Sequence, residues 1–118
     1  MNIRLTDCGR TQGEKLDCTV RATASCLGLS YVDAHARLKT LGRKDGRRFA
    51  FWKVTNQLNL NLRSDLSCMT LRKALPEMKQ GNFIVRVRGH VFAVIDGVII
   101  DTMSPNFDGH IKMVYEKI

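Results

Sequence analysis

The chain of 118 residues lacks the features of a membrane protein, a secreted protein or a chain of several domains. No stretch approaches the ~20 apolar residues of a membrane-spanning helix, and the segment Met1–Asp7 lacks the apolar run of a signal peptide. Proline is scarce, with two residues, and Pro, Gly and Ser do not cluster into a linker. These absences predict one cytoplasmic domain over residues 1–118 with no membrane partner.

Cysteine is also scarce and shows no metal-site spacing. The four residues Cys8, Cys18, Cys26 and Cys68 lie ten, eight and forty-two positions apart, which matches no common zinc module. A chain of this length buries about two-thirds of its unfolded surface without needing a disulfide or a metal. We therefore expect reduced thiols and no cofactor. A site that combines one of these cysteines with a histidine as metal ligands is the weaker alternative.

Acidic side chains are outnumbered, at 11 against 19 basic ones, which gives a net charge of +8. Such an excess is typical of proteins that bind nucleic acid or acidic surfaces. The densest basic group consists of Arg43, Lys44, Arg47, Arg48 and Lys53, and the other basic residues are scattered. Long basic side chains also cover apolar surface in solvated loops. The charge favours an acidic peptide or protein over nucleic acid as the partner, with Arg43, Lys44, Arg47 and Arg48 as a weak binding site.

The first two-thirds of the chain has helical periodicity and helix-capping signals. Small apolar residues recur at helical spacing before Gly28, which suits a left-handed C-terminal position. Ser30 and Asp33 have the spacing of a capping box, Gly42 ends the helix that follows, and Pro76 shortens a later one. The predicted helices are Thr19–Leu27, Tyr31–Leu41, Phe51–Leu60 and Thr70–Lys79.

After Gly81 the pattern becomes extended. Apolar residues alternate or run continuously through segments 83–88, 91–95, 98–101 and 111–118. The pair Asp96-Gly97 is typical of a type I′ hairpin turn, and Gly89 marks the preceding turn. The predicted fold class is α+β, with an N-terminal helical layer packed on a C-terminal antiparallel sheet.

Cys18 is the candidate nucleophile, because it stands directly before the first helical run. Unpaired backbone N–H groups and the positive end of the helix dipole favour a thiolate at that position. Gln12, six residues earlier, is a candidate donor to an oxyanion, together with the backbone N–H of Cys18.

The predicted hairpin register brings a base and its orienting carboxylate together. A two-residue turn at Asp96-Gly97 pairs Phe92 with Asp101, so His90 falls on the same face as Asp101. Such diagonal neighbours lie roughly 7 Å apart at the backbone. The Asp101 carboxylate can then accept a hydrogen bond from one imidazole nitrogen and leave the other nitrogen as a base.

The order of these candidates along the chain resembles the site of the papain-like cysteine peptidases, with Gln12 first, then Cys18, His90 and Asp101. Within that family, the small chain is most similar to double-glycine leader peptidases and compact phage or bacterial relatives. The resemblance implies a helical part packed on a small antiparallel sheet, with the site between them. It also implies a covalent thioester intermediate, a peptide or protein substrate, and the cytoplasm of a bacterium or phage-infected host.

Two residues beside Cys18 depart from the family pattern. Thr19 replaces the aromatic residue that often follows the nucleophile, and Asp17 places a carboxylate next to the thiol. The charge of Asp17 would raise the pKa of the thiol, unless the carboxylate caps the helix by accepting from backbone N–H groups.

The predicted function is hydrolysis of amide or isopeptide bonds by a Cys18-His90-Asp101 triad. The alternative is a non-catalytic basic binding protein on the same scaffold, with nucleic acid or a host protein as its partner. Among the residues outside the triad, Cys26 and Cys68 are expected in the core, His35 half-buried on a helix and His110 in a loop.

Overall fold

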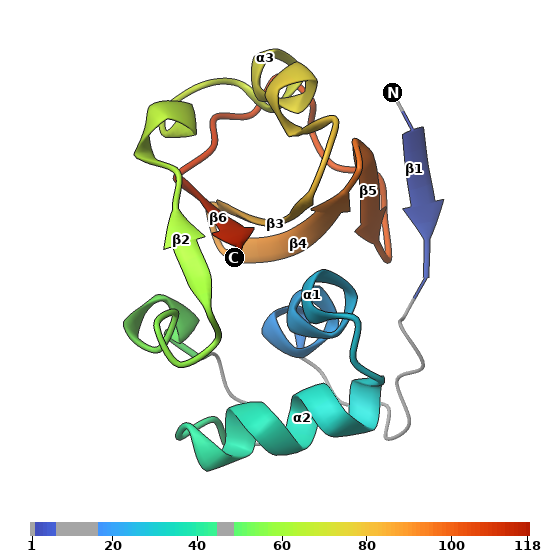
Figure 1. The fold of residues 1–118 in the computed structure, drawn as a ribbon. Coiled ribbons are helices and arrows are strands. Elements are labelled where there is room, and N and C mark those ends of the chain that lie inside the picture. The colour runs from blue at the N-terminus through green and yellow to red at the C-terminus, as the bar shows by residue number, and fades with distance from the viewer. Residues whose placement is uncertain (1, 7–16, 45–48) are drawn as a thin grey trace.

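A six-stranded mixed sheet forms the centre of the computed structural model, which describes residues 2–6, 17–44 and 49–118 (Figure 1). The strand order is β1-β5-β4-β3-β6-β2. All neighbouring strands are antiparallel except β1 and β5, which run parallel. The strands are β1 (Asn2–Leu5), β2 (Leu60–Leu62), β3 (Asn82–Val87), β4 (His90–Ile95), β5 (Val98–Asp101) and β6 (Met113–Lys117).

Helices cover both faces of this sheet (Figure 1). The helices α1 (Cys18–Leu27) and α2 (Tyr31–Thr40) lie on one face, and α3 (Leu71–Ala74) continues into the 3-10 helix η3 (Leu75–Met78) on the other. Two further 3-10 helices, η1 (Phe51–Lys53) and η2 (Ser64–Leu66), flank β2 in the chain. No helix in the described ranges is long and apolar enough to cross a membrane.

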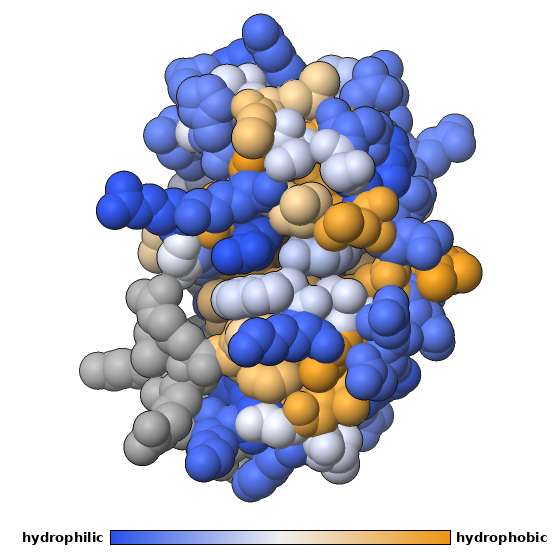
Figure 2. All heavy atoms as spheres, turned by 90° about the vertical axis from the view of Figure 1, so that its left-hand side faces the viewer, coloured by the Kyte–Doolittle hydropathy of each residue, from blue (hydrophilic) through white to orange (hydrophobic). Residues whose placement is uncertain are grey.

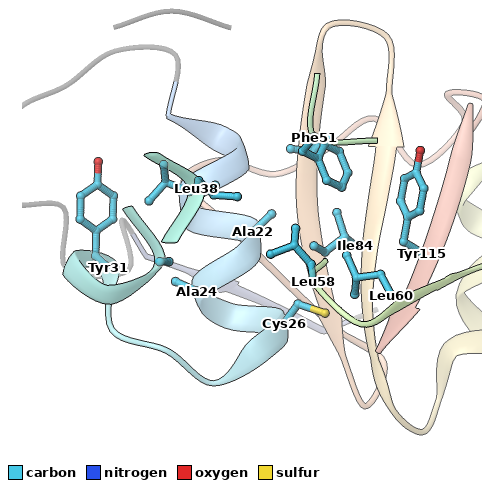
Figure 3. Packing of buried hydrophobic residues seen from close by; sticks show 13 residues of the cluster. Ala22, Ala24, Cys26, Tyr31, Leu38, Phe51, Leu58, Leu60, Ile84 and Tyr115 are labelled. Carbon is cyan, nitrogen blue, oxygen red and sulfur yellow. The ribbon is translucent and has the colours of Figure 1, made fainter. Parts of the chain in front are cut away.

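The two faces of the sheet carry separate apolar clusters, because successive side chains of a strand point to opposite faces. On β3, Ile84 belongs to the cluster with α1 and α2, whereas Phe83 and Val85 belong to the cluster with α3 and η3. Figure 3 shows Ala22 and Cys26 of α1 between α2 and the sheet, near Ile84. The small side chains of α1 let the helix lie close to the strands that carry His90 and Asp101.

The predicted cap at Ser30, the helix end at Gly28 and the hairpin turn at Asp96-Gly97 are confirmed. The Ser30 hydroxyl accepts a hydrogen bond from the Asp33 N–H at 3.1 Å, and Gly28 is left-handed with φ of 69°. Asp96 and Gly97 both have positive φ, at 48° and 81°, as a type I′ turn requires. Ile95 pairs with Val98 across that turn, which is the predicted register.

The helix predicted for Phe51–Leu60 is wrong. Only η1 is helical there, and Leu60 already belongs to β2, which pairs with β6. Phe51, Val54 and Leu58 have helical spacing, but Asn59 adopts a left-handed φ of 56° and the Leu60 N–H bonds to the Thr55 carbonyl. A turn rather than a helix therefore buries these apolar residues, and the chain then continues as the edge strand β2.

The predicted order of helices before an antiparallel sheet is also wrong in part. The strand β1 precedes all the described helices and lies parallel to β5, with Asn2 opposite Val98. This pairing depends on two segments at opposite ends of the chain, so local periodicity carries no sign of it. The helix predicted for Thr70–Lys79 is found as α3 and η3, with Pro76 at the start of the 3-10 part.

Candidate active site

Cys18 is the first residue of α1 and lines a cavity of about 300 Å³. The backbone carbonyl of Asp17 accepts the N–H of Arg21 at 3.1 Å, which fixes the start of the helix next to the thiol. The side chain of Cys18 is half-buried at the edge of the apolar cluster that α1 forms with the sheet. The predicted nucleophile therefore lies at a helix N-terminus and is accessible.

His90 and Asp101 are brought together by the β4–β5 hairpin. The His90 Nε2 atom lies 2.7 Å from Asp101 Oδ2. The other carboxylate oxygen of Asp101 accepts the Thr102 backbone N–H at 2.7 Å. Asp101 is 3% exposed, so this carboxylate is held in place with little water around it. The contact confirms the predicted proximity of His90 and Asp101.

Cys18 and His90 interact closely enough to shift the pKa values of both groups. Since Nε2 of His90 faces Asp101, the ring nitrogen left for the thiol is Nδ1. The hydrogen bonds with Asp101 and with Cys18 raise the pKa of His90 to about 9. Burial by itself would raise the pKa of the Cys18 thiol, but the hydrogen bond with His90 helps to lower it below its usual value. Both shifts act in the direction of a thiolate beside an imidazolium.

A second donor to Cys18 is the backbone N–H of Val91, which also lowers the pKa of the thiol. Val91 pairs with Arg86 on β3 directly after the Val87–His90 pair that closes the hairpin. Pairs that exchange ladder hydrogen bonds alternate with pairs that do not, so this N–H points away from β3. The sequence analysis did not identify this donor. The N–H of Val91 is available to Cys18 only because β5 ends at Asp101 and does not continue alongside Val91.

Asp17 does not act as the predicted side-chain cap. It stands at the N-cap position of α1, but its side chain makes no capping hydrogen bond. Instead, Asp17 Oδ1 accepts from Arg21 Nε at 3.1 Å and Oδ2 accepts from the Tyr31 hydroxyl at 2.9 Å. Its buried charge is therefore compensated by a cation and a hydroxyl rather than by the helix backbone.

Arg21 connects this carboxylate to the candidate triad. Its Nη1 atom donates to Asp101 Oδ1 at 3.1 Å, while Nε holds Asp17. The side chain is nine-tenths buried between the two carboxylates. Sequence reasoning did not single out Arg21, although an arginine within a run of small apolar helical residues is a signal that could have found it.

The cavity beside Cys18 is walled by aromatic and basic residues. The segment 49–52 forms one wall, and the end of the β3–β4 hairpin forms the other. The guanidinium carbon of Arg86 lies 4.0 Å from the centre of the Trp52 ring, in a cation–π contact.

On the side of the molecule that carries β2, the surface is mainly hydrophilic with small, separate hydrophobic groups (Figure 2).

Several other predicted site residues lie outside the described ranges or away from the triad. The oxyanion donor Gln12 and the residues Cys8, Arg47 and Arg48 fall outside the described residues. Arg43 is 2% exposed, so its guanidinium does not lie on the surface that a polyanion would contact. Lys44, the remaining member of the predicted basic site, is exposed.

The remaining cysteines and histidines are placed as follows. Cys26 is buried as predicted, whereas the core position expected for Cys68 is wrong, because that residue is exposed with a positive φ of 67°. His35 is half-buried on α2, and His110 is exposed. Among the described residues, no three His, Cys, Asp or Glu side chains gather as a metal site.

Comparison of the chain with protein-family models, with curated proteins and with solved structures finds no match. The chemistry of the site is therefore argued from its own geometry.

Proposed function

We propose that the protein is a thiol-dependent acyl-transfer enzyme of the papain-like type, which hydrolyses amide or isopeptide bonds. The observation that carries the proposal is the continuous chain of contacts from Cys18 through His90 to Asp101, at the edge of an open cavity. A nucleophile, a base and an orienting group within hydrogen-bond reach are what covalent catalysis by a thiol requires.

The reaction proceeds in two steps. The Cys18 thiolate attacks the carbonyl carbon, and the new S–C bond replaces the C–N bond as His90 gives its proton to the leaving amine. A water molecule then attacks the thioester and gives a proton to His90, and the C–S bond breaks to release the acid and restore the thiolate. The same groups can also carry deamidation, or transamidation when an amine replaces the water.

Two groups stabilise this reaction without taking part in bond formation. Arg21 is a positioning residue, because it holds the oxygen of Asp101 that does not contact His90. The backbone N–H groups at the start of α1 lie next to the nucleophile and can donate to the oxyanion. Gln12 stays the predicted side-chain donor for the same oxyanion.

The arrangement of the fold supports the papain-like proposal. The nucleophile opens a helix that packs on the sheet, and the sheet supplies His90 and Asp101 from adjacent strands (Figure 1). The strands β3 to β6 are antiparallel, as this type of site implies, whereas the parallel strand β1 is an addition. The free thiols of Cys18, Cys26 and Cys68 suit a reducing compartment, such as the cytoplasm of a bacterium or of a phage-infected host.

Activity-based labelling tests the proposal. A thiol-reactive peptide probe should label Cys18 in the parent protein and lose most of that labelling in His90→Ala, whereas Cys68→Ala, which removes an exposed thiol, should leave it intact. Labelling of Cys18 that is unchanged in His90→Ala would contradict the proposal. That result would favour the non-catalytic basic binding protein instead.

A further inference from the structure

The cavity beside Cys18 combines an aromatic wall with two basic side chains. Its described lining includes Arg86 and Lys112 and contains no carboxylate. Phe49, Phe51 and Trp52 supply the apolar part of the wall. A site with this composition fits a ligand that has a short apolar stem and a negatively charged end.

Arg86 is fixed in orientation within this cavity. The residue lies on β3 opposite Val91, whose N–H contacts the Cys18 sulfur. Its guanidinium carbon lies over the Trp52 ring, 4.0 Å from the ring centre, and the guanidinium also interacts with Tyr115. Stacking occupies the face of the guanidinium and leaves its N–H groups in the plane for an acceptor.

Lys112 is held next to Arg86 by the backbone. Its N–H donates to the Arg86 carbonyl at 2.8 Å, and its side chain is exposed at the cavity. Among the described residues, neither Arg86 nor Lys112 makes an ion pair with a carboxylate, in contrast to Arg63 and Arg72, which both do. The cavity therefore presents two cations whose charge no described acidic side chain compensates.

We propose that this cavity is the subsite for an acidic residue of the substrate, a glutamate or aspartate next to the scissile carbonyl. The inference rests on the proposed function, because it places the substrate by its bond to Cys18. The Arg86 guanidinium binds the carboxylate, Lys112 adds a second charge, and the aromatic wall contacts the methylene stem of the substrate side chain. The substrate class is an acidic peptide or a protein segment with an acidic residue at the cleavage site.

Two matched peptidyl chloromethyl ketones test this inference. They differ only in a Glu or a Gln next to the reactive ketone, and neither has a free C-terminal carboxylate, so any preference comes from the side chain. Alkylation forms a bond from Cys18 Sγ to the methylene carbon of the probe and releases chloride. The rate constant for labelling of Cys18, measured by mass spectrometry, should be about tenfold higher for the Glu probe.

Variants locate the source of that preference. Arg86→Gln should bring the ratio of the two rates close to one, and Lys112→Gln should lower it by a smaller factor. Lys73→Gln on α3 removes the same charge from the opposite face of the sheet and should leave the ratio unchanged. Arg86→Lys keeps the charge and loses the planar guanidinium, so it should retain part of the preference. The exposed position of Lys112 makes Lys112→Gln informative even if Arg86→Gln does not fold.

The outcomes separate this inference from the proposed function. Equal labelling of Cys18 by both probes, with labelling still dependent on His90, would overturn the acidic subsite and keep the enzyme. A preference for Glu that survives both Arg86→Gln and Lys112→Gln would also overturn the subsite, since the charge of His90 alone would explain it. Failure of both probes to label Cys18 faster than Cys68 would overturn both.

Discussion

Cys18 and Cys26 lie two turns apart on α1, yet the pKa of one thiol is lowered from its usual value and that of the other is raised. Burial raises the pKa of Cys26 to about 12. Burial also acts on Cys18, but hydrogen bonds with His90 and with the Val91 N–H lower its pKa below the usual value. Two cysteines in one helix therefore become a core residue and a candidate nucleophile, because only one of them meets a base.

The ends of the helix contribute to the same difference. Cys18 is at the N-terminus, where the helix dipole favours a negative charge, and Cys26 is in the last turn, where it opposes one. This contribution is modest, typically ~0.3–1 kcal/mol. The comparison shows that a helix N-terminus favours a thiolate, but that the partner from the sheet decides its reactivity.

The largest expected effect comes from removing each thiol in turn. Cys18→Ala should reduce kcat/KM for an acidic peptide by at least about 10⁴-fold, since the covalent step is lost. Cys26→Ala should keep kcat/KM within about twofold and lower the free energy of unfolding by about 1–2 kcal/mol through a small cavity. Peptide hydrolysis and urea denaturation measure the two effects. An equal loss of activity in both variants would contradict the assignment of Cys18 as the nucleophile and Cys26 as a core residue.

The next effect concerns Arg21, which lies between the two cysteines in the chain. Arg21→Met should lower the free energy of unfolding by about 3–5 kcal/mol, because it leaves the buried carboxylates of Asp17 and Asp101 without their shared cation. Arg63→Met is the matched control, since Arg63 pairs with two more exposed carboxylates and should cost about 1 kcal/mol or less. Denaturant titration of both variants gives the difference.

The role of Arg21 in positioning has a readout beyond stability. Arg21→Lys keeps a positive charge but cannot hold both carboxylates in the same fork geometry. We expect the pH profile of Cys18 labelling to shift towards higher pH in this variant. A profile identical to that of the parent would restrict Arg21 to a structural role.

A third expected effect is the difference in alkylation between Cys18 and Cys26. Their pKa values lie at least about three units apart, so their thiolate fractions at pH 7 differ by about 10³-fold or more. The higher basicity of the Cys26 thiolate recovers part of this factor, which leaves about 30-fold or more. Iodoacetamide labelling followed by peptide mass mapping measures it, with the exposed Cys68 as an internal reference. Labelling of Cys18 no faster than Cys68 would refute thiolate activation.

The smallest effect is the pH dependence set by His90. The lowered pKa of Cys18 means that its thiolate persists as the pH falls below 9.0 and is lost only when the pH falls through the lower folded value. His90→Ala should therefore reduce Cys18 labelling more at pH 6 than at pH 10, because the alkaline medium ionises a larger share of the thiol without the imidazole.

Hydrolysis should show a second pH limit. His90 has a pKa raised to about 9, so it holds the proton for the leaving amine below that pH and loses it as the pH rises through about 9. The rate should fall on that side even though Cys18 stays ionised. Hydrolysis that keeps rising above pH 10 would exclude His90 as the acid.

The local parts of this structure were predictable from the sequence. Ser30 and Gly28 mark helix boundaries through their own hydrogen bonds and φ angles, and Asp96-Gly97 fixes the hairpin register through turn geometry alone. Because register determines which residues share a face, the contact of His90 with Asp101 followed from the same two turn residues.

Residues 51–60 were not predictable in the same way. Their apolar spacing fits a helix, but pairing of Leu60 with Lys117 on β6 directs the chain into an edge strand. A short segment with weak local preference takes the conformation that its long-range partner offers. The same reason applies to β1, whose partner β5 lies near the other end of the chain.

The sequence by itself determined the α+β class, the position of Cys18 at a helix start and the register that joins His90 to Asp101, because each depends on neighbours a few residues away. The tertiary structure alone decided that Cys18 reaches His90 between helix and sheet, that Arg21 also holds Asp101, and that Arg86 lines the cavity beside the thiol. Those contacts join residues far apart in the chain, and they exist only once burial has brought the helix and the sheet together.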